Sequence, residues 1–145
     1  MRESKRLYVY SDGGSRGNPG PSALGVVILN EAKKQVASHK KFIGRCTNNQ
    51  AEYKAAIRAL EMAASLSSGE ISCYIDSELV VRQLNGIYRI KNEKLKNLHK
   101  ILKEREKPFE KVTYTHVKRT NPYIKKADRL VNEALDSRLK IPGIG

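Results

Sequence analysis

Tryptophan is absent from this sequence of 145 residues, and cysteine, methionine and phenylalanine each occur only twice. The two cysteines, Cys46 and Cys73, are too few for a disulfide framework and lack the spacing of a zinc site, so we expect two reduced, small hydrophobic side chains. No apolar run approaches the length of a membrane span, and residues 1–10 lack the hydrophobic core of a signal peptide. We therefore expect a cytoplasmic protein without a membrane partner.

Acidic residues are in short supply. Aspartate and glutamate number 15 against 28 lysines and arginines, which gives a formal net charge of +13. Such an excess favours a polyanionic partner, because counterion release drives the association of a basic protein with a polyanion. A well-solvated basic surface, or the charge enrichment typical of thermophiles, explains the composition equally well. The length predicts a single domain over residues 1–145, which we expect to be a monomer.

The sequence alternates between β-rich runs and helical segments. Thr47 followed by Gln50 is typical of a capping box and predicts a helix start, and Asn85-Gly86 predicts a helix end. Short connections between the first three strands favour antiparallel pairing, and the later alternation favours a mixed α/β sheet with helices on its faces. The predicted strands are Leu7–Asp12, Leu24–Leu29, Gln35–Ile43, Ile71–Asp76 and Val112–Val117, and the predicted helices follow Thr47 and cover Ser77–Leu84, Glu93–Glu106 and Ile124–Leu139.

Two aspartates stand at predicted strand ends. Asp12 precedes Gly13-Gly14, and Asp76 follows Tyr74-Ile75. The ends of strands are where open α/β sheets place their sites. Aspartate is also a common turn former and helix N-cap, and for Asp76 that structural role is as good an explanation as function.

Two further acids fall on predicted apolar helix faces. Glu52 shares its face with alanines at spacings of four, seven and eleven, and Asp128 shares one with Ile124, Val131 and Leu135. A buried carboxylate costs roughly several kcal/mol unless it is paired or bound to a cation. One such acid could be an ion-paired core residue, but two on separate helices suggest convergence with the acids at the strand ends.

A cluster of four carboxylates repels itself and needs divalent cations for stability. Ligand sets made only of oxygen favour Mg²⁺ or Mn²⁺ over zinc. Two such ions can hold a scissile phosphate, activate water and stabilise the leaving oxygen. A basic protein with an acidic metal cluster is therefore a candidate nuclease.

Four segments carry distinctive combinations of glycine, asparagine and acidic residues. They are SDGGSRGNPGP (Ser11–Pro21), CTNNQAEYKA (Cys46–Ala55), YIDSELVVRQLNG (Tyr74–Gly86) and KKADRLVNEAL (Lys125–Leu135). These segments resemble the motifs of the type 1 ribonuclease H family, in the order typical of that family, and four motifs in order are far more specific than any one of them. The resemblance extends from about Leu7 to Leu139 and leaves a short tail at residues 140–145.

The resemblance implies a five-stranded mixed sheet, with its first three strands antiparallel, flanked by helices. It implies an endoribonuclease that uses two Mg²⁺ or Mn²⁺ ions to hydrolyse the RNA strand of RNA–DNA hybrids and leaves 3′-hydroxyl and 5′-phosphate ends. The ions would be held by the same four acids, which are Asp12, Glu52, Asp76 and Asp128. The implied contacts to the RNA strand are Gly13, Asn18, Asn48, Asn49 and Glu78, and the implied phosphate pocket for the DNA strand is formed by Arg45, Thr47 and Asn92.

The sequence departs from the family pattern at several places. Many members carry a basic, aromatic handle between the third and fourth motifs, whereas Ile87–Lys94 is short and contains no Trp. The basic segment Lys91–Lys107 either replaces the handle or is a solvated helix face. Many relatives also have a His before the fourth motif, but Lys118–Lys126 contains none. We expect His116, in the last predicted strand, to have a packing or surface role. Glu78 replaces a common Gln.

Two alternatives stay open from the sequence. A nuclease of the same fold could act on DNA or on double-stranded RNA, because fold alone does not separate these substrates. A catalytically silent module that only binds hybrids would be expected to lack at least one of the four acids, yet all four are present.

Overall fold

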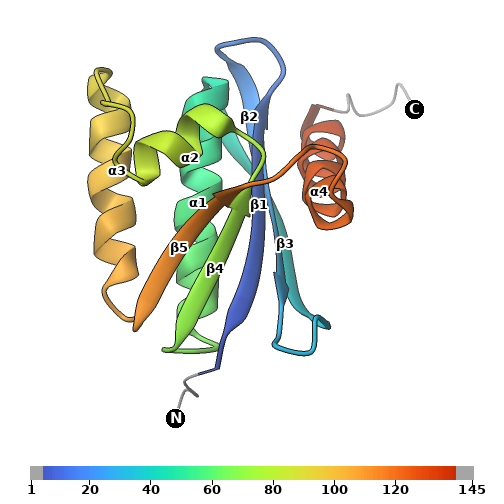
Figure 1. The fold of residues 1–145 in the computed structure, drawn as a ribbon. Coiled ribbons are helices and arrows are strands. Elements are labelled where there is room, and N and C mark those ends of the chain that lie inside the picture. The colour runs from blue at the N-terminus through green and yellow to red at the C-terminus, as the bar shows by residue number, and fades with distance from the viewer. Residues whose placement is uncertain (1–4, 140–145) are drawn as a thin grey trace.

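The computed structural model describes residues 5–139, so the predicted tail at residues 140–145 lies outside the described residues. Every predicted helix and strand is present, with some shifted boundaries (Figure 1). In chain order the elements are β1 (Leu7–Ser15), β2 (Gly20–Leu29), β3 (Gln35–Cys46), α1 (Asn48–Ala64), β4 (Glu70–Ile75), α2 (Glu78–Leu84), α3 (Glu93–Glu106), β5 (Lys111–His116) and α4 (Pro122–Leu139).

The strands form one five-stranded sheet in the order β3-β2-β1-β4-β5. The β1–β2 and β2–β3 pairs are antiparallel, and the β1–β4 and β4–β5 pairs are parallel. This topology confirms the predicted mixed sheet with its first three strands antiparallel. It also places β1 in the middle, where both of its edges can pair.

Alternate residues of the central strands pack on opposite faces of the sheet, as the pleat requires. Val9 and Val26 belong to the large core cluster that contains the apolar face of α1 and residues of α3, whereas Tyr10 and Val27 pack with Ile124 of α4. Figure 1 shows α1 and α3 on one side of the sheet and α4 on the other. A helix from each face can therefore contribute a side chain to the end of β1.

The β1–β2 hairpin is longer than the sequence predicts. We predicted that Asp12 ends the first strand, but the antiparallel ladder continues through Gly13, Gly14 and Ser15. The parallel pairing of β1 with β4, in contrast, is described only from Leu7 to Tyr10. Asp12 thus lies in a strand that is paired by β2 on one side and extends past the described β4 pairing on the other.

Two glycines allow both helices to approach the sheet closely. A Cβ atom on Gly13 would overlap the backbone of Ala51 and Glu52 in α1, and a Cβ on Gly25 would overlap the carbonyl of Ala127 in α4. Gly25 is the β2 partner of Asp12 in the ladder. Any side chain at these two positions would push away the helix segments that carry Glu52 and Asp128.

We expect Gly25→Ala to lower the free energy of unfolding by about 1–3 kcal/mol, because the added methyl group has no space against α4. Urea unfolding measures this change. Gly86→Asn is the control, because its Cβ position is open and asparagine tolerates the positive φ found there, so a loss of only about 1 kcal/mol or less is expected. Equal stability of Gly25→Ala and the parent would contradict the close packing of β2 against α4.

Candidate active site

Glu52 reaches the sheet because the first turn of α1 is held firmly. Thr47 accepts a hydrogen bond from the Gln50 backbone, and the Gln50 side chain accepts one from the Thr47 backbone, which confirms the predicted capping box. Five residues after the cap, Glu52 accepts a hydrogen bond from the Gly13 backbone N–H at 2.6 Å. The close contact at Gly13 thereby aims the Glu52 carboxylate at the middle of the sheet.

Three of the predicted acids meet at this point. Asp12 from β1, Glu52 from α1 and Asp76 just after β4 each offer a carboxylate oxygen, and these oxygens lie within 4.8 Å of one another. Asp12 and Glu52 are each only 6% exposed, and the Asp76 side chain is 8% exposed. The convergence predicted from the sequence is confirmed for these three residues.

Asp128 joins the cluster in a different way from the one we predicted. We expected it on the buried face of its helix, yet it is exposed, while Ala127 and Val131 beside it are buried. The reason is that α4 packs through Ile124, Ala127 and Val131, so position 128 falls at the edge of the apolar stripe. From that edge Asp128 lines the same cleft as Asp12, and its charge helps to raise the pKa of Asp12.

Burial and mutual repulsion change the protonation of the cluster. Burial, followed by the charges of Asp76 and Asp128, raises the pKa of Asp12 to about 8. Burial and the neighbouring Asp12 and Asp76 also raise the pKa of Glu52 well above its usual range, although the Gly13 N–H opposes that shift. Carboxyl groups held in this way are stabilised in the ionised form by a cation.

Arg119 is a site residue that the sequence analysis missed. Its Nε donates to Asp76 Oδ2 at 3.2 Å, and its side chain is 88% exposed. Arg119 belongs to the Lys118–Lys126 segment, whose sequence departs from the family pattern by lacking a histidine. His116 itself is exposed at the end of β5, as predicted. A cation bound at the cluster would compete with Arg119 for the Asp76 carboxylate.

The four acids open into a cleft of about 520 Å³. Of the predicted contacts to the RNA strand, Gly13, Asn48 and Asn49 line this cleft. The lining also includes residues that the sequence analysis did not assign to the site, namely Gly14, Ser15, Arg16, Ser77, Arg119, Val131, Asn132 and Leu135.

The other two predicted RNA contacts, Asn18 and Glu78, do not line the cleft and form contacts within the protein. Asn18 accepts a hydrogen bond from the Asn48 backbone at 3.0 Å, and Asn48 in turn accepts one from the Ser15 backbone at 2.9 Å. These bonds brace the β1–β2 loop against the start of α1. Glu78 is exposed on α2 and forms an ion pair with Arg82 at 3.2 Å, and it is not among the residues that line the cleft.

A second depression, of about 290 Å³, lies between α1 and α3. Arg45 lines it, as do Lys54, Lys94 and Asn97, which the sequence analysis did not assign. Thr47 and Asn92, the other two predicted phosphate ligands, do not line it. They cap α1 and α3 through hydrogen bonds from Gln50 N and Leu95 N.

The donor set fits a hard divalent cation. The three oxygen donors come from rigid elements, they are shielded from water, and they offer no sulfur or imidazole that would favour zinc. Asp128 lies at the open side, next to Asp12, where a further ligand is needed. The fold and site together define an α/β protein with an acidic cation site at the centre of its sheet.

Comparisons with known proteins identify the family. The protein family described as "Reverse transcriptase-like" matches residues 10–134. Ribonuclease HI of Halobacterium salinarum is 43% identical over 131 residues, which are 90% of this chain and 65% of that protein. A bifunctional protein of Mycobacterium tuberculosis is 39% identical, and the match covers 91% of this chain but only 36% of that protein. The chain thus spans about two thirds or less of the length of these two relatives.

Comparisons with solved structures lead to the same family. The crystal structure of RNase H1 from Halobacterium salinarum superposes with a TM-score of 0.87 at 42% identity, over 91% of this chain and 98% of that one. LC11-RNase H1 in complex with RNA/DNA hybrid superposes with a TM-score of 0.79 at 39% identity, over 92% of this chain and 99% of that one. The chain belongs to the ribonuclease H family, of type 1.

Over residues 5–139, no helix has the length and apolar character needed to cross a membrane.

The raised pKa of Asp12 predicts how the metal-free protein responds to pH. The folded protein keeps a proton on Asp12 up to about pH 8, whereas an ordinary aspartate loses it near 3.8. The folded state therefore binds more protons across this window, and its stability falls as the pH rises from about 4 to about 8. In EDTA, we expect the free energy of unfolding of Asp12→Asn to exceed that of the parent by about 1–2 kcal/mol at pH 8, and to differ little from it at pH 4.

Chemical unfolding at several pH values measures this difference. Glu104→Gln is the matched control, because it removes one carboxylate from an exposed ion pair with Lys107. A stability difference between Asp12→Asn and the parent that does not change between pH 4 and pH 8 would show that the cluster does not hold Asp12 protonated.

Proposed function

We propose that this protein is an endoribonuclease that hydrolyses the RNA strand of RNA–DNA hybrids. The observation that carries the proposal is the convergence of Asp12, Glu52 and Asp76, with Asp128 at the rim, in a cleft of a strongly basic protein. The similar LC11-RNase H1 is described in complex with an RNA/DNA hybrid, which supports the same substrate here. We also infer a single domain that acts as a monomer in the cytoplasm, where such a substrate would be met.

The four acids would hold two Mg²⁺ or Mn²⁺ ions. When bound, such ions supply a water nucleophile near neutral pH and neutralise the charge that develops on the phosphate. Because water and not the 2′-hydroxyl would attack, the expected ends are a 3′-hydroxyl and a 5′-phosphate.

The protein's own residues orient the ligands and the substrate. Gly13 holds Glu52 through its backbone N–H, and Asn48 is fixed by Ser15 at the same end of the cleft. Asn48 and Asn49 line the cleft with amide groups, which can bond to the 2′-hydroxyls and base edges of a wide minor groove. Asn18 supports Asn48 through the backbone, and Glu78 is available to the same strand if it leaves Arg82.

The depression between α1 and α3 suits a phosphate of the DNA strand. Arg45, Lys54 and Lys94 bring three positive charges to its walls, and the nearby start of α1 adds the favourable end of a helix dipole. Thr47 would serve both as the helix cap and as a ligand, and Asn92 would approach from the start of α3.

Double-stranded RNA is the second candidate substrate. Its RNA strand has the same 2′-hydroxyls that the cleft would contact. The basic depression between α1 and α3 would bind the phosphates of the second strand whether that strand is DNA or RNA.

A cleavage assay tests the proposal directly. With Mg²⁺ or Mn²⁺ the protein is expected to cut the RNA of a labelled hybrid, to leave double-stranded DNA intact, and to lose activity in EDTA. Asp12→Asn keeps the side-chain shape but removes a ligand charge, so we expect turnover to fall by about three orders of magnitude with little loss of hybrid binding. Products with 2′,3′-cyclic phosphate ends, or near-parental turnover in Asp12→Asn, would refute the mechanism.

Arg45→Ala is expected to weaken hybrid binding by about 1–3 kcal/mol, the contribution of a charge-assisted contact to phosphate. Thr47→Ala should weaken binding as well and lower stability by about 1 kcal/mol through loss of the cap. Fluorescence anisotropy with catalytically silent protein measures binding. Lys34→Ala removes an exposed positive charge in the turn between β2 and β3, does not line the depression, and serves as the control. Equal losses of affinity in Lys34→Ala and Arg45→Ala would show that the depression contributes only non-specific charge attraction.

A further inference from the structure

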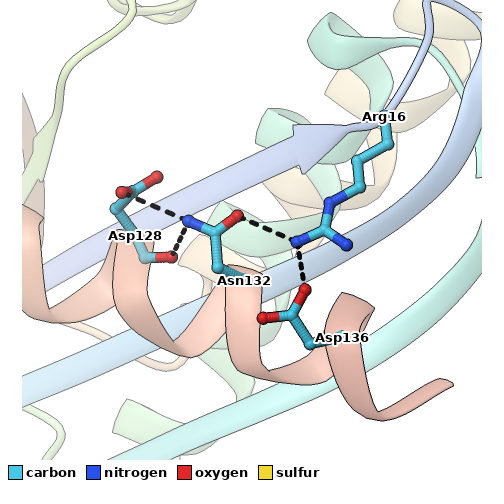
Figure 2. A network of polar contacts seen from close by, with 4 residues as sticks. All are labelled: Arg16, Asp128, Asn132 and Asp136. Atoms are coloured by element: carbon cyan, nitrogen blue, oxygen red, sulfur yellow. Dashed lines mark hydrogen bonds and ion pairs between the residues drawn. The ribbon is translucent and has the colours of Figure 1, made fainter. Parts of the chain in front are cut away.

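A chain of polar contacts connects Asp128 to the loop between β1 and β2 (Figure 2). Asn132 Nδ2 donates to the backbone carbonyl of Asp128 at 3.1 Å and to its Oδ2 at 3.4 Å. Arg16 Nη2 donates to Asn132 Oδ1 at 3.4 Å and to Asp136 Oδ1 at 2.6 Å. The contacts therefore run from Asp136 through Arg16 and Asn132 to the Asp128 carboxylate.

The network spans two parts of the fold. Asp128, Asn132 and Asp136 follow one another at four-residue intervals, so they lie along one face of α4. Arg16 comes directly after β1, the strand that carries Asp12. A contact between Arg16 and α4 thus constrains how far Asp128 stands from Asp12, and both Arg16 and Asn132 line the cleft.

Arg16 determines which way the Asn132 amide points. Its guanidinium offers only donors, so it requires the amide oxygen on its side. The amide nitrogen is then turned toward Asp128, whose carboxylate offers only acceptors when ionised. With the amide reversed, donors would face donors and acceptors would face acceptors. Asp136 holds the guanidinium in the place where it imposes this choice.

Asp128 is also the acid of the cluster with the least structural support from packing. Asp12 and Glu52 are buried, and Glu52 is further held by the Gly13 N–H. Asp128 is exposed at the edge of α4, where neighbouring side chains do not enclose its carboxylate. An orienting hydrogen bond is therefore more important for Asp128 than for the buried acids.

We propose that Asn132 is a positioning residue that holds Asp128 over the cation site, with its amide oriented by the Arg16–Asp136 ion pair. This inference rests on the proposed function only in taking Asp128 as a ligand of the bound cation. Groups that orient the ligands of a metal commonly change its affinity without contacting the metal.

The network is suitable for mutation because it contributes little to folding. The side chains of Arg16 and Asp136 are 41% and 68% exposed, and exposed ion pairs stabilise a fold only weakly. Variants in this network are therefore expected to fold, and their melting temperatures should stay within about 2 °C of the parent.

The test is a double-mutant cycle on Mn²⁺ binding, measured by calorimetry on the metal-free protein without substrate. Asn132→Ala is expected to weaken Mn²⁺ binding roughly tenfold and to lower kcat on a hybrid to a similar degree, with KM unchanged within about twofold. In an Asp128→Asn background, Asn132→Ala should have no further effect on Mn²⁺ affinity, because its action passes through the Asp128 carboxylate.

A matched pair of variants on α4 tests the contribution of Arg16. Asp136→Asn releases Arg16 and is expected to weaken Mn²⁺ binding about two- to threefold. Glu133→Gln removes the same charge from an exposed ion pair with Lys40, and no contact links that pair to Asp128, so parental affinity is expected.

Two results would overturn the inference. One is parental Mn²⁺ affinity in Asn132→Ala, which together with a raised KM would assign Asn132 to the substrate. The other is a loss of affinity that persists in the Asp128→Asn background. A parent protein that binds Mn²⁺ but does not cut hybrids would refute the proposed function, while the binding cycle would still decide the role of Asn132.

Discussion

The close approach of two helices to the middle of one hairpin is the constraint on which the rest of the structure depends. Gly13 lets the backbone of α1 touch β1, and Gly25, one strand away, lets α4 touch β2 from the other face. Both helices carry an acid within a residue of the contact, Glu52 in α1 and Asp128 in α4. The site is therefore a direct result of how the layers pack.

The same packing creates an electrostatic problem. Asp12, Glu52 and Asp76 are brought together with little water around them, which opposes ionisation and raises the pKa of Asp12 and Glu52. In the metal-free protein, bound protons and the exposed Arg119 guanidinium relieve part of the repulsion. The repulsion destabilises the fold, and packing of the apolar core beneath the site offsets this loss of stability. A bound cation would neutralise the repulsion.

Much of the fold and most of the cluster could be predicted from the sequence, because local patterns carry that information. The capping box at Thr47, the helical spacing of Glu52 and the β-rich runs are short-range signals, and each is confirmed. The burial of Asp128 was predicted wrongly. Helical spacing gives the direction of a side chain but not how far the opposing sheet extends over it.

The contacts that complete the site have no short-range signal. Arg119 and Asp76 are 43 residues apart, and Arg16 and Asn132 are 116 apart, so neither pair can be found by periodicity or motif spacing. Asp12 was placed at a strand end because glycines usually mark turns, whereas here Gly13 and Gly14 stay in the ladder to allow close packing. Such residues become evident only when the elements are assembled.

The central claim is that the acids brought together by this packing form a cation site. Anomalous X-ray diffraction from crystals soaked in Mn²⁺ tests it most directly. The account predicts an anomalous peak bounded by Asp12, Glu52 and Asp76, with Arg119 displaced from Asp76. Crystals that bind Mn²⁺ only elsewhere, with the Arg119–Asp76 contact intact, would contradict it.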